Sequence, residues 1–95
     1  MAGVYATTTT TTTRVTVRYF AAARAAAGTE TEPLELPGTP TVDDVVTALR
    51  DRHGAELARV LERCSFLLDE FAVRDRSTPL SDGATFDVLP PFAGG

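Results

Sequence analysis

The sequence predicts an α+β domain in which a mixed sheet packs on one main helix. Three observations indicate this fold class: an alternating apolar pattern early in the chain, one amphipathic helical stretch in the middle, and a strand-like stretch close to the last residue. The chain has 95 residues, 43% of them hydrophobic, which suits a single small domain.

The N-terminal part is expected to form two strands of this sheet. Residues 1–13 include a run of threonines with no apolar face, so we expect a disordered leader or a frayed extension of the first strand. Arg14–Phe20 alternates apolar and polar residues, as a half-buried strand does. An alanine-rich stretch then predicts a turn of helix that ends at Gly28, and Glu32–Gly38 predicts a second strand that pairs with the first as a hairpin.

The clearest helix of the chain starts after Thr41 and ends at Gly54. Thr41 and Asp44 have the spacing of a capping box, and glycine is a typical residue just after a helix. Residues 55–63 predict a second, shorter helix. Apolar side chains recur every three or four residues and predict one buried stripe on the main helix: Val42, Val45, Val46 and Leu49.

The C-terminal part predicts further strands. Residues 65–73 have the pattern of one strand, or of a strand broken by a bend at Asp69-Glu70, and residues 74–83 that of a loop. The last strand begins at Ala84 and places Phe86 and Val88 on one face, with Asp87 and Leu89 on the other.

The order strand, strand, helix, short helix, strand, strand suggests a ubiquitin-like β-grasp domain over residues 14–89, with residues 90–95 as a protruding tail. Pro90 and Pro91 have no N–H, so the last strand leaves the sheet there and the chain stays extended. Gly94 and Gly95 have no Cβ and can pass through a narrow channel. The tail therefore predicts a C-terminal carboxylate that is delivered into the active site of another protein.

Composition excludes several other classes. The net charge of −4 argues against a nucleic-acid-binding protein. The apolar runs are too short to cross a bilayer, the N-terminus lacks a secretory-signal pattern, and Cys64 has no disulfide partner, so we expect a cytoplasmic protein. No spacing of metal ligands and no phosphate-binding loop occurs, so we expect no metal and no bound cofactor. All nine cationic side chains are arginines, which leaves no side-chain amine for isopeptide attachment.

The remaining reactive residue types predict structural roles. His53 lies in the last turn of the main helix, where we expect a surface imidazole stabilised by the helix dipole. Cys64 borders an apolar run and is expected to be a small core residue. The acidic pairs Asp43-Asp44 and Asp69-Glu70 predict a helix start and a turn. The chain is thus not expected to be catalytic on its own.

Residues 14–95 resemble the small subunit of molybdopterin synthase. The opening motif F-A-x-x-R-x-x-x-G of that family is matched by Phe20, Ala21, Arg24 and Gly28. The stretch "PTVDDVVTALRDRH" resembles the helix of the family, and "PLSDGATFDVLPPFAGG" resembles its close, with the Asp-Gly turn, the double proline and the terminal Gly-Gly.

The resemblance implies a sulfur carrier. In that family a ubiquitin-activating-type adenylyltransferase uses ATP to adenylate the terminal glycine, and sulfur supplied by a sulfurtransferase then gives a thiocarboxylate. The small subunit inserts its tail into the large subunit of a heterotetramer and donates sulfur to precursor Z (cyclic pyranopterin monophosphate). Carried over to this chain, Gly95 is the acyl site, and the tail that positions it consists of Pro90, Pro91, Phe92, Ala93 and Gly94. Leu89 and Phe20 are then candidates for a partner-binding surface.

Two departures from the family and three alternatives remain. Ala25 replaces a glutamate that often follows the motif arginine, and Leu68-Asp69 replaces a Val-Asn pair in the third strand. The alternatives are a sulfur carrier for thiazole or cysteine synthesis, a protein modifier joined to target amines, and a β-grasp interaction module with an incidental Gly-Gly end. The Phe20 to Arg24 motif favours molybdopterin synthesis over the first alternative.

Overall fold

Strands and helices occur in nearly the expected order along residues 11–91, the part of the chain that the computed structural model describes. Within this range no helix is long and apolar enough to span a bilayer. The elements are β1 (Thr12–Tyr19), α1 (Ala21–Ala27), β2 (Thr31–Pro37), α2 (Val42–His53), α3 (Ala55–Leu61), β3 (Ser65–Leu68), β4 (Phe71–Ala72) and β5 (Ala84–Leu89).

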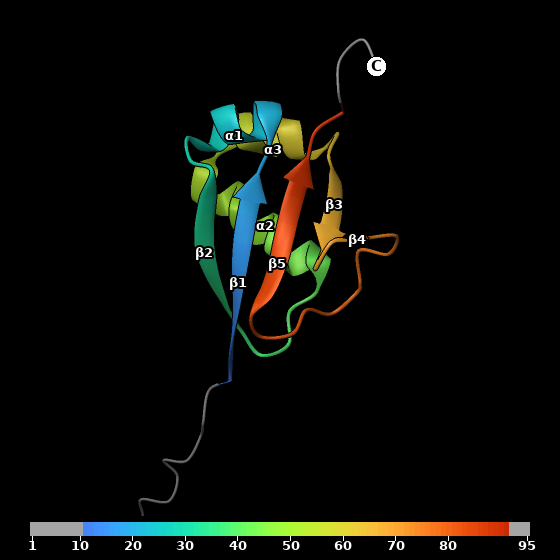
Figure 1. Cartoon of the computed structure of the whole chain (residues 1–95). Helices are drawn as coiled ribbons and strands as arrows, with labels where there is room; N and C mark the ends of the chain where they lie inside the picture. Colours follow the sequence, from blue (N-terminus) through green and yellow to red (C-terminus); the bar gives the residue numbers. More distant parts are fainter. Residues whose placement is uncertain (1–10, 92–95) are drawn as a thin grey trace, which may run out of the picture.

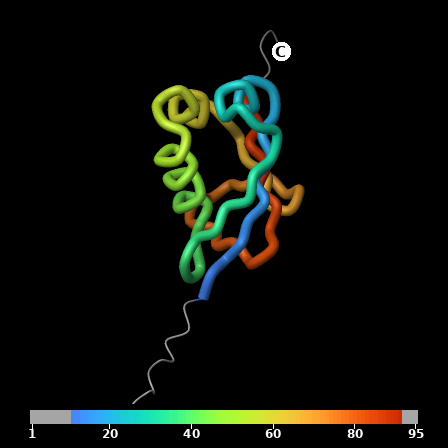
Figure 2. The backbone as a smooth tube through the Cα atoms, turned by 90° about the vertical axis from the view of Figure 1, so that its left-hand side faces the viewer, coloured from blue at the N-terminus to red at the C-terminus, as the bar shows by residue number. Residues whose placement is uncertain are grey.

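The strands form one mixed sheet in the order β2-β1-β5-β3-β4 (Figure 1). The central strands β1 and β5 run parallel, with Val17 opposite Phe86, and the other neighbours are antiparallel. The helices lie on one face of the sheet and leave its other face open (Figures 1 and 2). This arrangement is the ubiquitin-like β-grasp fold that the order of elements predicted.

The core lies between the sheet and α2. The predicted stripe of α2 is fully packed against the inward residues of the central strands, and Phe66 stacks on Phe86 with ring centroids 5.1 Å apart. Thr41 and Asp44 form the predicted capping box, in which each side chain bonds the backbone N–H of the other residue. The apolar contacts with α2 exclude water from one face of β1 and β5. No helix or strand of residues 11–91 covers the opposite face of these two strands.

The structure refines three local expectations. First, β1 begins at Thr12 rather than Arg14, because Thr12 and Thr13 pair with the end of β2 and the Thr13 hydroxyl donates to the Gly38 carbonyl at 2.7 Å. Second, the predicted loop 74–83 contributes Leu80 to the core, where 2% of it is exposed. Third, of the two interpretations of residues 65–73, the broken strand is confirmed.

The break in that strand has a local cause. Asp69 and Glu70 both have positive φ angles, 49° and 74°, and turn the chain back so that Phe71 pairs with Leu68. A positive φ is tolerated by aspartate more readily than by branched residues, and it permits a tight two-residue hairpin. The predicted turn at this acidic pair is confirmed.

Candidate functional site

The tail begins at the end of β5, in the middle of the sheet. The carbonyl of Val88 accepts a hydrogen bond from the Phe20 amide at 3.2 Å, which ties the end of β5 to the end of β1. β5 ends at Leu89, Pro90 is buried, and Pro91 is exposed, so the strand stops at the double proline as predicted. The remaining predicted tail residues lie outside the described residues: Phe92, Ala93, Gly94 and Gly95.

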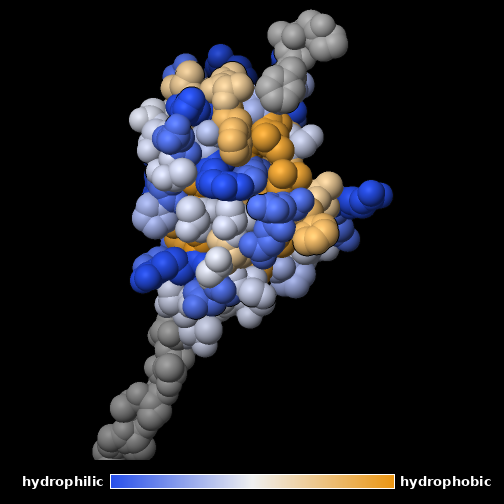
Figure 3. All heavy atoms as spheres, viewed as in Figure 1, coloured by the Kyte–Doolittle hydropathy of each residue, from blue (hydrophilic) through white to orange (hydrophobic). Residues whose placement is uncertain are grey.

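The two candidates for a partner surface, Leu89 and Phe20, lie beside Pro90 and Pro91, which form the root of the tail. Leu89 is half-buried and Phe20 is 38% exposed, an unusual exposure for a large apolar side chain. Leu89 pairs with Ser65 of β3, whose neighbour on the same face, Leu67, is also half-buried. Figure 3 shows apolar atoms gathered over the half of the open face that lies toward the end of β5. The structure thus gathers apolar side chains from separate strands near the root of the tail.

An ion pair lies on the same face and is not evident from the sequence. Arg18 Nε and Nη2 donate to the two Asp87 carboxylate oxygens at 2.6 and 2.7 Å. The Arg18 side chain is 40% exposed but that of Asp87 only 4%, so the guanidinium covers the carboxylate. The hydrogen bonds and negative charge of Asp87 raise the pKa of Arg18. Sequence patterning placed Asp87 on this face correctly but gave no sign of its burial, because its partner lies 69 residues away.

A second polar cluster lies on the helix-covered face and corrects the expectation for His53. Its imidazole is no surface group: His53 Nε2 lies 2.5 Å from Glu32 Oε2, with only 15% of the side chain exposed. The buried Tyr19 hydroxyl donates to the same carboxylate, and Arg52 Nη1 donates to its other oxygen at 3.1 Å. The end of α2 is therefore joined to β1 and β2 through Glu32.

The pKa shifts in this cluster follow from burial and charge. Burial, reinforced by the hydrogen bond to Glu32, raises the pKa of Tyr19. Burial alone would raise the pKa of Glu32, but hydrogen bonds from Tyr19, His53 and Arg52 outweigh it and lower that pKa. Glu32 is therefore held as a carboxylate with its donors already in place, which suits a structural link between elements.

Cys64 has the character of a structural residue. It is half-buried against the core, its Sγ donates to the Val60 carbonyl at 3.2 Å, and burial raises its pKa to about 11. A thiol with so high a pKa is a weak nucleophile at neutral pH. Among residues 11–91, no group of three or more His, Cys, Asp or Glu side chains is arranged to hold a metal ion.

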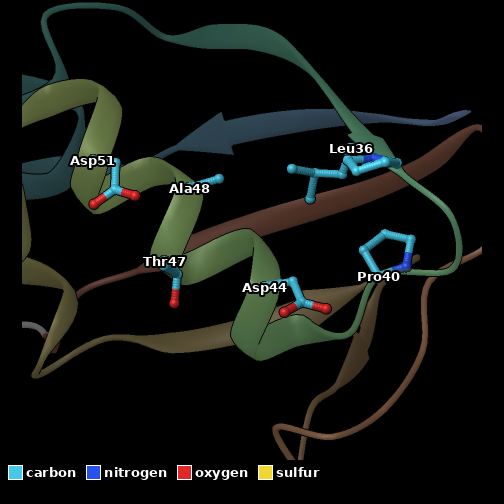
Figure 4. A pocket seen from close by; sticks show the side chains of 7 residues that line it. Leu36, Pro40, Asp44, Thr47, Ala48 and Asp51 are labelled. Carbon is cyan, nitrogen blue, oxygen red and sulfur yellow. The ribbon is translucent and has the colours of Figure 1, made fainter.

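A shallow hollow of about 390 Å³ lies between β2 and α2 (Figure 4). Leu36 and Pro40 line one side, and Asp44, Ala48 and Asp51 of α2 line the other (Figure 4). None of the predicted site residues contributes to it. The tail root and the open face beside it are thus the better candidate for a functional site.

The fold, with a last strand that ends at a double proline, defines a small ubiquitin-like β-grasp protein. The sequence profile of the ThiS family matches residues 17–95, so the chain belongs to that family. A search of curated proteins found no match.

Solved structures of several related proteins are similar to this chain. Molybdopterin converting factor, subunit 1, from Pyrococcus furiosus is 26% identical with a TM-score of 0.73, over 84% of this chain and 99% of its own. Small archaeal modifier protein 1 from Methanosarcina acetivorans is 28% identical with a TM-score of 0.73, over 90% and 99%. A chain of the BexX/CysO complex from Amycolatopsis orientalis is 26% identical with a TM-score of 0.63, over 85% and 99%.

Proposed function

We propose that this protein is the small, sulfur-carrying subunit of molybdopterin synthase. In this role Gly95 carries a thiocarboxylate and donates its sulfur to precursor Z in molybdenum cofactor biosynthesis. The observation that carries the proposal is the stretch from Phe20 to Gly28, which matches the opening motif of that subunit and folds beside the root of the tail.

The conformation of this stretch accounts for its key residue types. Gly28 ends α1 with a φ of 78°, a left-handed conformation that favours glycine, and its N–H caps the Arg24 carbonyl. Ala25 stands where relatives often have the glutamate next to the motif arginine, but Arg24 pairs instead with Glu30 at 2.6 Å. The similarity to molybdopterin converting factor, subunit 1, from P. furiosus further supports the assignment.

The proposed chemistry takes place in the active sites of partners. An adenylyltransferase joins the Gly95 carboxylate to AMP and releases pyrophosphate from ATP. Sulfur from a sulfurtransferase then displaces AMP, so that a C–S bond replaces the C–O bond to phosphate. The large subunit of a heterotetramer binds the tail and uses the thiocarboxylate as its sulfur donor. This chain supplies the carrier, and the ATP and pterin sites belong to the partners in the cytoplasm.

Intact-mass spectrometry tests the first part of this proposal. The purified chain is incubated with the adenylyltransferase, ATP and a sulfur source, and its mass should rise by the difference between sulfur and oxygen. A chain lacking Gly95 is the matched control and should stay unchanged. The large subunit and precursor Z are then added, and molybdopterin should form only with the thiocarboxylated full chain. A thiocarboxylate that yields no molybdopterin contradicts the pathway while leaving the carrier chemistry intact.

Two alternatives have specific support. The similarity to small archaeal modifier protein 1 favours a protein modifier, which would leave Gly95 joined to target amines in amide bonds. The similarity to a chain of the BexX/CysO complex favours a carrier for a different sulfur-requiring synthesis. Covalent adducts of the chain with cellular proteins would indicate the first, and sulfur transfer to an acceptor other than precursor Z would indicate the second.

A further inference from the structure

The sheet ends in two edge strands, β2 on one side and β4 on the other (Figure 1). An edge strand carries backbone N–H and C=O groups that its own sheet does not pair, so it can accept a strand from another chain. The two edges of this sheet differ in their ability to do so.

The β2 edge is closed to strand addition. Residues of an antiparallel pair alternate between exchanging hydrogen bonds with the partner strand and directing them away from it. The Tyr19 N–H donates to the Glu30 carbonyl, so the register between β1 and β2 directs the backbone of every second residue from Thr31 onward to the outside. Pro33 and Pro37 are among these residues and have no N–H to donate. A strand that approached this edge would find donors missing there.

The β4 edge is open. The Val73 N–H donates to the Phe66 carbonyl, so by the same alternation the N–H and C=O of Ala72 point away from β3. Ala72 is exposed, and its small side chain does not obstruct an incoming strand. The neighbouring Phe71 is 77% exposed, which is unusual for a large apolar side chain. The edge therefore offers both backbone groups and apolar surface to a partner.

The residues around Ala72 are complementary to themselves. From Glu70 to Arg74 the chain reads E-F-A-V-R. When a second copy pairs antiparallel with Ala72 opposite Ala72, Phe71 lies opposite Val73 and Glu70 lies opposite Arg74, and each pair occurs twice. Aromatic residues opposite β-branched ones, and opposite charges, are favourable cross-strand pairs. Within residues 11–91 neither Glu70 nor Arg74 takes part in an ion pair, so both charges are available.

A hollow of about 270 Å³ lies beside this edge and provides space for the aromatic ring. Leu68, Phe71 and Val73 contribute its apolar lining. Because Phe71 of the second copy lies opposite Val73, its ring reaches this hollow. Both Phe71 rings then lose contact with water, which is the apolar part of the driving force.

We propose that two copies of this chain form a dimer through β4, with Ala72 opposite Ala72 across a two-fold axis. The two five-stranded sheets continue as one, and their uncovered faces lie on the same side, because the two-fold axis of an antiparallel pair is perpendicular to the sheet. The β5 strands run in opposite directions, so the two tail roots lie at opposite ends and both stay free. Prolines close the outer β2 edges, so the assembly stops at two copies. This inference does not depend on the sulfur-carrier chemistry.

Sedimentation velocity of the full chain over a concentration series tests this inference. The chain should pass from monomer to dimer as its concentration rises toward the millimolar range, because the paired segment is short. Glu70→Arg places two arginines opposite each other at both ends of this segment, and Arg74→Glu places two glutamates there. The dissociation constant of each variant should rise about tenfold or more.

An equal mixture of Glu70→Arg and Arg74→Glu chains tests the register itself. In the mixed dimer each introduced charge lies opposite a charge of the other sign, so the mixture should dimerise within about twofold of the wild-type dissociation constant. The double variant Glu70→Arg/Arg74→Glu should do the same on its own. The Ala72 amide should also exchange its hydrogen more slowly as the wild-type concentration rises, because the dimer gives it an acceptor.

Glu56→Arg is the matched control. Glu56 is exposed on α3, away from β4, and its replacement changes the net charge by the same amount as Glu70→Arg. This variant should dimerise as the wild type does. A wild-type chain that stays monomeric, single charge variants that dimerise as well as wild type, or a mixture that stays monomeric would each overturn the inference.

Discussion

Arg18 and Tyr19 are consecutive residues of β1, yet they build two very different polar clusters. Their side chains point to opposite faces of the sheet, and each holds a carboxylate from a neighbouring strand. Tyr19 binds Glu32 of β2 on the face covered by α2, whereas Arg18 binds Asp87 of β5 on the face that α2 does not cover.

The difference lies in where each cluster finds its partners. Glu32 accepts hydrogen bonds from Tyr19, Arg52 and His53, so its partners all come from the chain itself. Arg18 uses two of its five N–H donors on Asp87, and 40% of its side chain is exposed. We therefore expect that changes to the Tyr19 cluster alter the stability of the fold strongly, and that changes to the partly exposed Arg18–Asp87 pair alter it little.

The largest effect is expected for Tyr19→Ala. Tyr19 is 1% exposed, and removal of a buried aromatic ring costs about 3–5 kcal/mol of the free energy of unfolding. Tyr19→Phe keeps the ring and loses only the hydrogen bond to Glu32, so it should cost about 1 kcal/mol. Urea denaturation at pH 7 measures both values. Equal losses in the two variants would show that the hydroxyl, and not the packing, stabilises this region.

Glu32→Gln should have the next largest effect, and it should depend on pH. Loss of the charged acceptor should cost about 1.5–3 kcal/mol at neutral pH. The pKa of Glu32 is lowered in the folded state, so its contribution is complete above its ordinary value of 4.5 and is lost as the pH falls through the folded value. The stability difference between wild type and variant should therefore shrink below about pH 4.5.

Denaturation midpoints measured at several pH values check this expectation. Tyr19, Arg52 and His53 are the groups that face Glu32, and they are unchanged in the variant. A difference that stays constant between neutral pH and acid would contradict a lowered pKa for Glu32.

A smaller effect is expected at the other end of α2. Thr41→Ala removes the hydroxyl that accepts the Asp44 N–H and should cost about 1 kcal/mol. Thr47→Ala is the matched control, because Thr47 is exposed on the same helix and takes no part in the cap. In thermal unfolding experiments, the melting temperature of Thr41→Ala should be lower than that of the wild type, whereas Thr47→Ala should not be destabilised. Equal melting temperatures would mean that the packing of α2 does not depend on its capping box.

The smallest change in stability is expected for Arg18→Met/Asp87→Leu. A buried ion pair that is replaced by apolar residues often leaves stability unchanged, and Arg18 is partly exposed, so the shift should be below about 1 kcal/mol. Urea denaturation measures this shift. A loss comparable to that of Tyr19→Ala would remove the contrast between the two clusters.

Much of the fold could be predicted from local sequence patterns. The alternation of β1, the apolar stripe of α2 and the Thr41 cap depend on residues that are neighbours in the chain, and the structure confirms them. The left-handed conformation of Gly28 also has a local cause, since glycine tolerates it best.

The contacts between distant segments could not be predicted in the same way. His53 has an ordinary position at the end of a helix, and only the packing of α2 against β2 places it beside Glu32. In the sequence Leu80 looks like a loop residue. Its burial depends on the β-bridge between Thr41 and Pro79 and on the hydrogen bond that the Leu80 N–H donates to the Pro40 carbonyl.

The sequence by itself determined the class of domain, the exit of the last strand at Pro90-Pro91 and the motif from Phe20 to Gly28. These features follow from backbone preferences and from periodic burial, which act over a few residues. Only the tertiary structure decided which carboxylates Arg18 and Tyr19 hold and which face remains open. The physical reason is that a pattern shows which side chains share a face, whereas burial and charge pairing depend on the strand or helix that packs against that face.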